Sequence, residues 1–189
     1  GASFLNAGLG YGGSCFPKDV KALIRTADGA GLPLEVLSAV DSVNERQKTL
    51  LAKKLRAALG HKLKGARIAV WGLAFKPRTD DMREAPSLTL IEELLSEGAT
   101  ICAHDPAAMN EARHSVGDRI EYAETNYDAL TGADALVVVT DWNEYRHPDF
   151  SRVRAALKRP VIIDGRNLYD PEQMKELGIQ YFSIGRASA

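Results

Sequence analysis

The stretch RIAVWGLAFKPRTDDMREAPSLTLIEELLSEGATICA, residues 67–103, decides the fold of this chain. It opens with an apolar segment at 67–72 and passes into a polar loop. An amphipathic helix is expected from Ser87 to Glu97, ended by Gly98, and a second apolar segment follows at 100–103. A strand, a crossover helix and another strand form the unit from which parallel sheets are built. The stretch therefore predicts an α/β fold.

The same alternation continues to the end of the chain and predicts a Rossmann-like, doubly wound parallel sheet. About six strands are expected, at 67–72, 100–103, 120–123, 135–140, 161–164 and 179–183. The helices between them are expected at 87–97, 126–130, 150–157 and 171–177. The segment 135–140 is nearly all apolar, which is typical of a strand buried on both faces.

A helical region is expected ahead of the sheet. Apolar residues recur at roughly helical spacing over 33–59, with a break at Gln47 and a closing Gly60. At 1.5 Å per residue such a helix spans roughly 40 Å, enough to connect two domains and to offer an apolar stripe to a second subunit. The sequence thus predicts a central helical region at 1–63 and the Rossmann-like domain at 64–189.

Composition excludes several classes of protein. The 189 residues are 45% hydrophobic, and 24 basic residues balance 25 acidic ones, so neither nucleic acid nor an anionic membrane is an expected partner. No apolar run approaches 18 residues, and no segment resembles a signal peptide. The two cysteines, Cys15 and Cys102, are expected to be free thiols in a reducing cytoplasm, with Cys102 in the core. Their spacing gives no metal site.

The octet GGSCFPKD, residues 12–19, is the strongest candidate for chemistry. Pro17 suits the first turn of a helix expected at 17–28. Cys15 then lies at the N-terminal end of that helix, where outward-pointing N–H groups and the nearby Lys18 favour thiolate over thiol. A thiolate in this place is a candidate nucleophile. On composition alone, a capped helix with a buried cysteine remains an equal alternative.

Other residues are candidates for ligand contact. Gly12 and Gly13 lack a Cβ, so their loop can lie close to a sugar or phosphate, and Ser14 is expected to cap the next helix. Ligands gather at the carboxyl ends of parallel strands, where Lys76 and Arg166 would bring cations to a diphosphate. The alternative for both is an exposed salt-bridging side chain.

Three segments together resemble the UDP-glucose/GDP-mannose dehydrogenase family. They are FLNAGLGYGGSCFPKD at 4–19, GLAFKPRTDDMREAPS at 72–87 and DGRN at 164–167. Three matches in the same order along most of the chain are far more specific than one short motif.

The resemblance implies oxidation of the C6 alcohol of UDP-glucose to a carboxylate, with NAD as cofactor and a thioester on Cys15. Asp19, one helical turn further, would hold or polarise water. The residues that would contact the sugar nucleotide are Phe4, Leu5, Tyr11, Gly12, Phe75, Lys76 and Arg166. Lys18 and Arg83 would contact NAD. GDP-mannose and a UDP-N-acetyl-hexosamine are the alternative substrates.

The resemblance also implies a homodimer formed through the helix at 33–59. A complete dinucleotide-binding domain is also implied ahead of this sequence, because in 1–189 no Gly-x-Gly-x-x-Gly turn follows an expected strand. This chain is therefore expected to be an inactive fragment of the enzyme. Two other hypotheses remain: a non-catalytic nucleotide-sugar-binding dimerisation module, and a cysteine hydrolase or acyltransferase that pairs Cys15 with His104 or His147.

Overall fold

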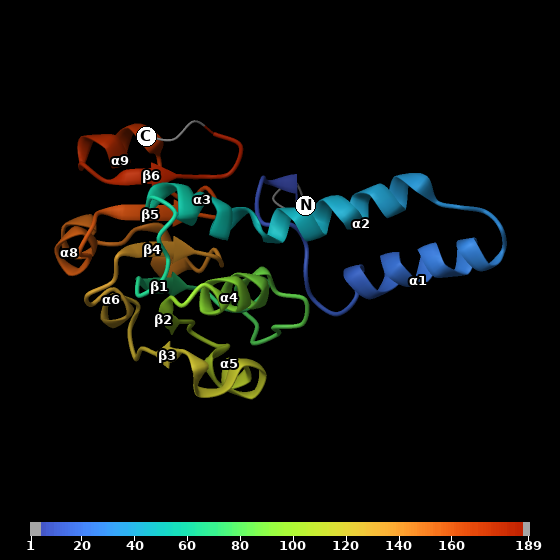
Figure 1. Cartoon of the computed structure of the whole chain (residues 1–189), viewed down its shortest axis with the longest axis horizontal. Coiled ribbons are helices and arrows are strands. Elements are labelled where there is room, and N and C mark those ends of the chain that lie inside the picture. Colours follow the sequence, from blue (N-terminus) through green and yellow to red (C-terminus); the bar gives the residue numbers. More distant parts are fainter. Residues whose placement is uncertain (1–4, 187–189) are drawn as a thin grey trace.

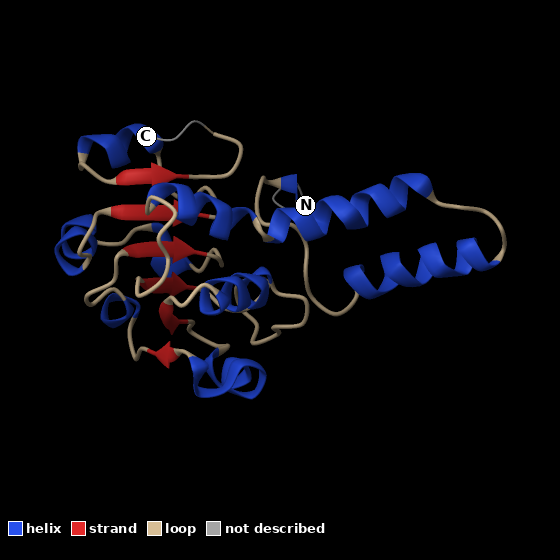
Figure 2. Ribbon diagram, viewed as in Figure 1, coloured by secondary structure: helices blue, strands red, loops and turns tan. Residues whose placement is uncertain are grey.

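Six parallel strands form one sheet in the computed structural model, which describes residues 5–186 (Figure 2). The strands are β1 (Arg67–Trp71), β2 (Thr100–His104), β3 (Glu121–Tyr122), β4 (Ala135–Val138), β5 (Val161–Asp164) and β6 (Gln180–Phe182). Their order is β3-β2-β1-β4-β5-β6, and every neighbouring pair is parallel. This order is that of the doubly wound Rossmann fold, so the predicted fold class is confirmed.

Helices cover both faces of the sheet and also precede it (Figure 1). They are α1 (Phe16–Gly29), α2 (Glu35–Lys48), α3 (Leu50–Ala58), α4 (Pro86–Ser96), α5 (Met109–Val116), α6 (Asn126–Ala129), α7 (Asn143–Arg146), α8 (Phe150–Ala156) and α9 (Pro171–Glu176). A short 3₁₀ turn follows α5 at Gly117–Arg119. The helices α3, α4 and α5 pack on one face, and α6, α7, α8 and α9 pack on the other.

Alternating side chains of each strand supply the two cores. Ile68 and Val70 of β1 pack in the first core, and Ala69 and Trp71 pack in the second. All four residues of β4, at the centre of the sheet, are completely buried. A strand covered on both faces needs apolar residues throughout, which explains the unbroken apolar run.

The helices expected between the strands are present within a residue or two of their predicted bounds. The helices α5 and α7 were not expected. The segment that forms α5, at 109–116, is largely polar, and α7 has only four residues, which is too short for a periodic pattern.

The single helix expected over 33–59 is a wrong prediction, because two helices meet at Thr49. The Thr49 hydroxyl donates to the Arg46 carbonyl at 2.9 Å, and its backbone N–H bonds to the same carbonyl at 3.3 Å. A hydroxyl that competes for a helix carbonyl bends the helix. Beyond the bend, α3 enters the core, with Leu51 and Leu55 completely buried.

The helix α2 instead runs away from the sheet, with α1 packed beside it (Figure 1). Together they form a helical hairpin that projects from the α/β domain. Within residues 5–186, no helix has the length and apolar character needed to span a membrane.

Candidate functional site

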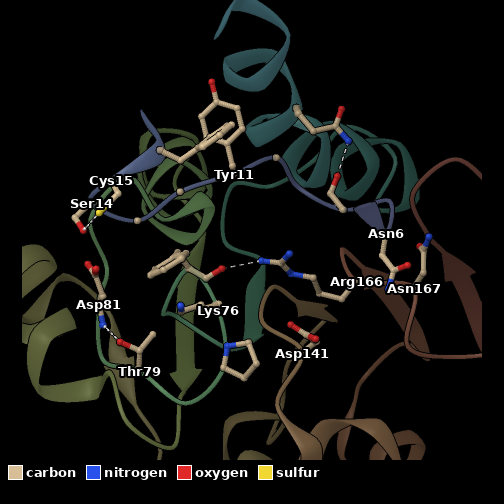
Figure 3. A pocket seen from close by; sticks show the side chains of 18 of the residues that line it. Asn6, Tyr11, Ser14, Cys15, Lys76, Thr79, Asp81, Asp141, Arg166 and Asn167 are labelled. Atoms are coloured by element: carbon tan, nitrogen blue, oxygen red, sulfur yellow. Dashed lines mark hydrogen bonds between the residues drawn. The ribbon is translucent and has the colours of Figure 1, made fainter. Parts of the chain in front are cut away.

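A cavity of about 1060 Å³ opens beyond the carboxyl ends of β1, β4 and β5 (Figure 3). It is bounded on one side by the loops that follow these strands and on the other by residues 6–16 and α2. Six of the predicted site residues line it: Tyr11, Gly12, Cys15, Phe75, Lys76 and Arg166. The fold therefore brings together side chains as distant in the sequence as Tyr11 and Arg166.

Cys15 is exposed and immediately precedes α1. Its Sγ lies 3.6 Å from the Ser14 hydroxyl. Cys15, and not Ser14 as expected, occupies the capping position of α1, and its side chain makes no capping hydrogen bond. The Asp19 N–H donates to the Cys15 carbonyl at 2.8 Å, so Asp19 lies one turn beyond the thiol.

Glycines let the loop before Cys15 lie against the loop that follows β1. A Cβ on Gly12 would be 2.5 Å from the Glu84 carbonyl oxygen. Gly13 has φ +85°, and a Cβ there would be 2.8 Å from the Phe75 ring. The Gly13 N–H also donates to the Arg83 carbonyl at 2.8 Å. Only glycine fits both positions, since any side chain would separate the two loops.

Arg166 crosses the floor of the cavity. Its Nε donates to the Val139 carbonyl at 2.6 Å, and its Nη2 donates to the Phe75 carbonyl at 3.1 Å. Burial lowers the pKa of Arg166, although the carboxylates of Asp141 and Asp164 act in the opposite direction. A guanidinium remains protonated in spite of such a shift, so the cavity keeps a fixed positive charge.

Lys76 adds a second cation to the same cavity. Its side chain is exposed, with Nζ 5.1 Å from the centre of the Phe75 ring. In Figure 3, Lys76 and Arg166 lie between Cys15 at one side of the view and Asn167 at the other. Two cations between a thiol and the opposite wall suit a ligand with a central diphosphate.

An ion pair also stands at the cavity. Asp141 follows β4, and its carboxylate lies 2.9 Å from the Arg146 guanidinium. Both side chains line the cavity and are partly exposed, so solvent screens their interaction.

A second cavity, of about 470 Å³, meets the first at Cys15. Lys18, Lys21 and Arg83 give it three cationic side chains. The Arg83 guanidinium bonds both carboxylate oxygens of Asp81, at 2.9 and 2.8 Å, and this contact lowers the pKa of Asp81. Asp81 thus organises the loop, while Arg83 stays at the cavity.

Other predicted residues lie elsewhere. Leu5 is 83% exposed and lines neither cavity. Asp19 also lines neither one, and its carboxylate lies 3.1 Å from Lys18 Nζ. Phe4 lies outside the described residues.

The two candidate histidine bases do not border the thiol's cavities. His104 is buried, with Nδ1 2.9 Å from the Tyr145 hydroxyl, and burial lowers its pKa. Neither His104 nor His147 lines either cavity that Cys15 borders. In the described part of the chain, no three His, Cys, Asp or Glu side chains group in a way that could hold a metal ion.

Sequence reasoning missed Gln47 and Arg146, which line the larger cavity, and Asn44, which holds the loop before Cys15. For Gln47 a signal existed, since it interrupts the apolar spacing of its helix. Arg146 lies in the short α7, for which no pattern was available.

Comparison with known proteins gives concordant results. Two family models match: the UDP-glucose/GDP-mannose dehydrogenase family UDP binding domain at residues 69–171, and the central domain of the same family at residues 1–46. The chain is 49% identical over 194 aligned residues to a UDP-glucose 6-dehydrogenase of Pseudomonas aeruginosa. It is 46% identical over 186 residues to UDP-glucose 6-dehydrogenase TuaD of Bacillus subtilis.

These alignments cover 100% and 98% of this chain but only 43% and 40% of the two relatives. A solved UDP-glucose dehydrogenase from Pyrobaculum islandicum superposes with a TM-score of 0.82 at 36% identity, over 96% of this chain and 39% of that one. Sequence and fold therefore agree, and this chain belongs to the UDP-glucose/GDP-mannose dehydrogenase family.

Proposed function

We propose that this chain forms the nucleotide-sugar site and carries the nucleophile of an enzyme that oxidises UDP-glucose to UDP-glucuronate. The observation that carries the proposal is the larger cavity, in which Lys76 and Arg166 lie between the Cys15 thiol and the far wall. A diphosphate beside the two cations would direct the sugar to the thiol and the base to the opposite side. The relatives' names, which specify UDP-glucose, support the choice of substrate.

The two parts of the chain would contribute different groups to this site. Residues 1–63 would contribute the thiol and its loop, and residues 64–189 would contribute the two cations. The ligand would then lie across both parts, which explains why one cavity draws residues from each.

Cys15 would allow two oxidations at one carbon. Its thiolate adds to the C6 aldehyde left by the first oxidation, forming a C–S bond while the carbonyl oxygen takes a proton. The second oxidation leaves a thioester on Sγ. Water then attacks its carbonyl carbon, the C–S bond breaks, and the free thiol and the sugar carboxylate are released. Asp19 lies one turn from Cys15 and pairs with Lys18, so its carboxylate would have to turn toward the thiol to hold that water.

NAD, when bound, would accept the hydride lost in each oxidation. The smaller cavity fits part of such a dinucleotide, because Lys18 and Arg83 bring positive charge beside the thiol. These residues would hold the cofactor at its edge, and the other contacts would come from the rest of the enzyme.

The test measures how many NADH molecules form for each sugar oxidised. The complete enzyme is incubated with limiting UDP-glucose and excess NAD, and NADH is counted per sugar, in parallel with GDP-mannose and a UDP-N-acetyl-hexosamine. We expect two NADH per UDP-glucose in the parent enzyme and in a Cys102→Ala control, and no steady turnover in Cys15→Ser.

Other results separate the alternatives. One NADH per sugar would contradict the thioester mechanism, and faster turnover of another nucleotide sugar would contradict the substrate. UDP binding by calorimetry, without turnover of any sugar, would leave a binding and dimerisation module.

A further inference from the structure

The loop that ends at Cys15 has little means of holding its own shape. Residues 8–13 include Gly8, Gly10, Gly12 and Gly13, and glycine loses more conformational freedom on ordering than any other residue. A nucleophile must nevertheless be held so that the reacting atoms meet at about 3–3.5 Å. Side chains from outside the loop are therefore needed to fix it.

The polar face of α2, formed by Asn44, Gln47 and Lys48, supplies them. Asn44 and Lys48 are only 4% and 3% exposed, although polar side chains on helices are usually solvated. On the same helix Val36 and Val43 are exposed. The helix thus buries polar residues against the loop and leaves apolar ones in solvent.

Asn44 holds both backbone groups of Tyr11. Its Oδ1 accepts the Tyr11 N–H at 2.7 Å, and its Nδ2 donates to the Tyr11 carbonyl at 3.1 Å. Gly10 has φ +86°, and a Cβ on it would collide with the Asn44 amide. The amide therefore fixes the backbone four residues before the thiol, at a contact that only glycine permits.

Gln47 and Lys48 add further contacts from α2 around this loop. Gln47 Nε2 donates to the Gly8 carbonyl at 2.6 Å. Lys48 Nζ lies 2.8 Å from Glu84 Oε2 and 3.0 Å from Glu45 Oε1. The backbone of Glu84 is in turn the surface against which Gly12 lies. Lys48 therefore ties α2 to the support on the far side of the loop.

We propose that Asn44 and Lys48 are positioning residues for Cys15, and that Asn44 carries most of the effect. Both act through the loop, since neither lines the cavity of the reacting thiol. The inference rests on the proposed function, and it predicts lost turnover with little change in substrate affinity.

The test uses the complete enzyme with three variants. Asn44→Ala removes both bonds to Tyr11, and Asn44→Asp keeps the acceptor for its N–H but places a second oxygen against its carbonyl. Ser42→Ala is the matched control, because Ser42 is an exposed polar residue of the same helix that bonds Arg46 instead of the loop. Steady-state kinetics and hydrogen exchange of residues 8–15 are measured on each.

We expect kcat to fall by about 10- to 100-fold in Asn44→Ala. KM for UDP-glucose should change by no more than about threefold, because Lys76 and Arg166, which lie outside the loop, would still bind the diphosphate. Loop exchange should accelerate by about tenfold or more, since the Tyr11 N–H loses its acceptor. Asn44→Asp should lie between Asn44→Ala and the control.

The proposal is overturned if kcat matches the control, if kcat falls while loop exchange does not change, or if both Asn44 variants unfold. The last result would make Asn44 a residue of global stability. If the parent enzyme does not oxidise UDP-glucose, the proposed function fails, and loop exchange alone then decides whether Asn44 positions the loop.

Discussion

Asp105 is a buried carboxylate that holds the loops around the larger cavity. It is completely buried, and its oxygens accept five hydrogen bonds, from the backbone N–H groups of Leu73, Ala74, Ala107 and Ala108 and from Trp142 Nε1. Ala74 immediately precedes Phe75 and Lys76, and Trp142 follows Asp141. One side chain thus connects the loops after β1, β2 and β4.

Removing that carboxylate should damage both stability and binding. Asp105→Ala leaves buried N–H donors without an acceptor, so we expect the free energy of unfolding to fall by about 3 kcal/mol or more, and Asp105→Asn to lose less. Displacement of Lys76 should weaken UDP binding by about tenfold. Urea denaturation and calorimetry measure the two effects.

Asp80→Asn, an exposed control in the loop after β1, should change the free energy of unfolding by less than about 0.5 kcal/mol. Equal losses in Asp80→Asn and Asp105→Asn would contradict the assignment.

Acid should release the contact between Glu84 and Lys48. The hydrogen bond from Lys48 lowers the pKa of Glu84 below its ordinary value of 4.5, against an opposing effect of burial. A carboxyl whose pKa is lowered by folding stabilises the protein above its unfolded pKa and loses that effect as pH falls through the folded value. We expect the stability difference between the parent and Glu84→Gln, full at pH 7, to shrink between about pH 5 and pH 3. Urea titrations across this range measure it, and a difference independent of pH would contradict the pairing.

At the scale of elements, apolar patterning predicted the sheet well because buried strands and their crossover helices have strong, simple signals. Val161–Asp164, for example, is strand β5 at its predicted bounds. Patterning failed over 33–59, because the break depends on one hydroxyl, that of Thr49, which competes for a carbonyl. Spacing alone does not reveal that competition.

The two halves of that predicted helix, α2 and α3, should therefore contribute differently to the free energy of unfolding. Leu55 of α3 is completely buried, and Val36 of α2 is 78% exposed. Leu55→Ala should lower the free energy of unfolding by about 2–5 kcal/mol, because it leaves a cavity in the core. Val36→Ala should change it by less than about 0.5 kcal/mol when the chain is dilute. Denaturation of both variants measures this, and similar losses would indicate one helix packed along its whole length.

The candidate site was predictable where short motifs carry the chemistry. Cys15, Lys76 and Arg166 all stand in such segments and all line one cavity. Asn44 and Gln47 were not predictable, because their partners are backbone groups 33 and 39 positions away, and only the folded chain brings these together.

For the whole molecule, the projecting hairpin leaves an apolar surface without cover. Leu32, Val36 and Val43 are at least half exposed on it, at 68%, 78% and 50%. Leu23 of α1 adds to the same hairpin, at 52%. Large apolar side chains exposed together on one projecting hairpin are typical of an interface and not of a monomer's exterior. We propose that a second copy covers it, through α2, which is the exposed part of the segment 33–59.

Adding charge to this surface should separate the two copies. Val36→Lys combined with Val43→Lys places two ammonium groups where apolar contact is needed, so we expect the parent chain to sediment as a dimer at micromolar concentration and this variant as a monomer. Both residues lie outside the lining of the two cavities, so UDP affinity should change by less than about twofold. Asn110→Lys, an exposed position on α5, should remain dimeric. A monomeric parent would exclude self-association. A variant that stays dimeric would show that the copies meet through another face, and the apolar side of α2 would then need a different partner.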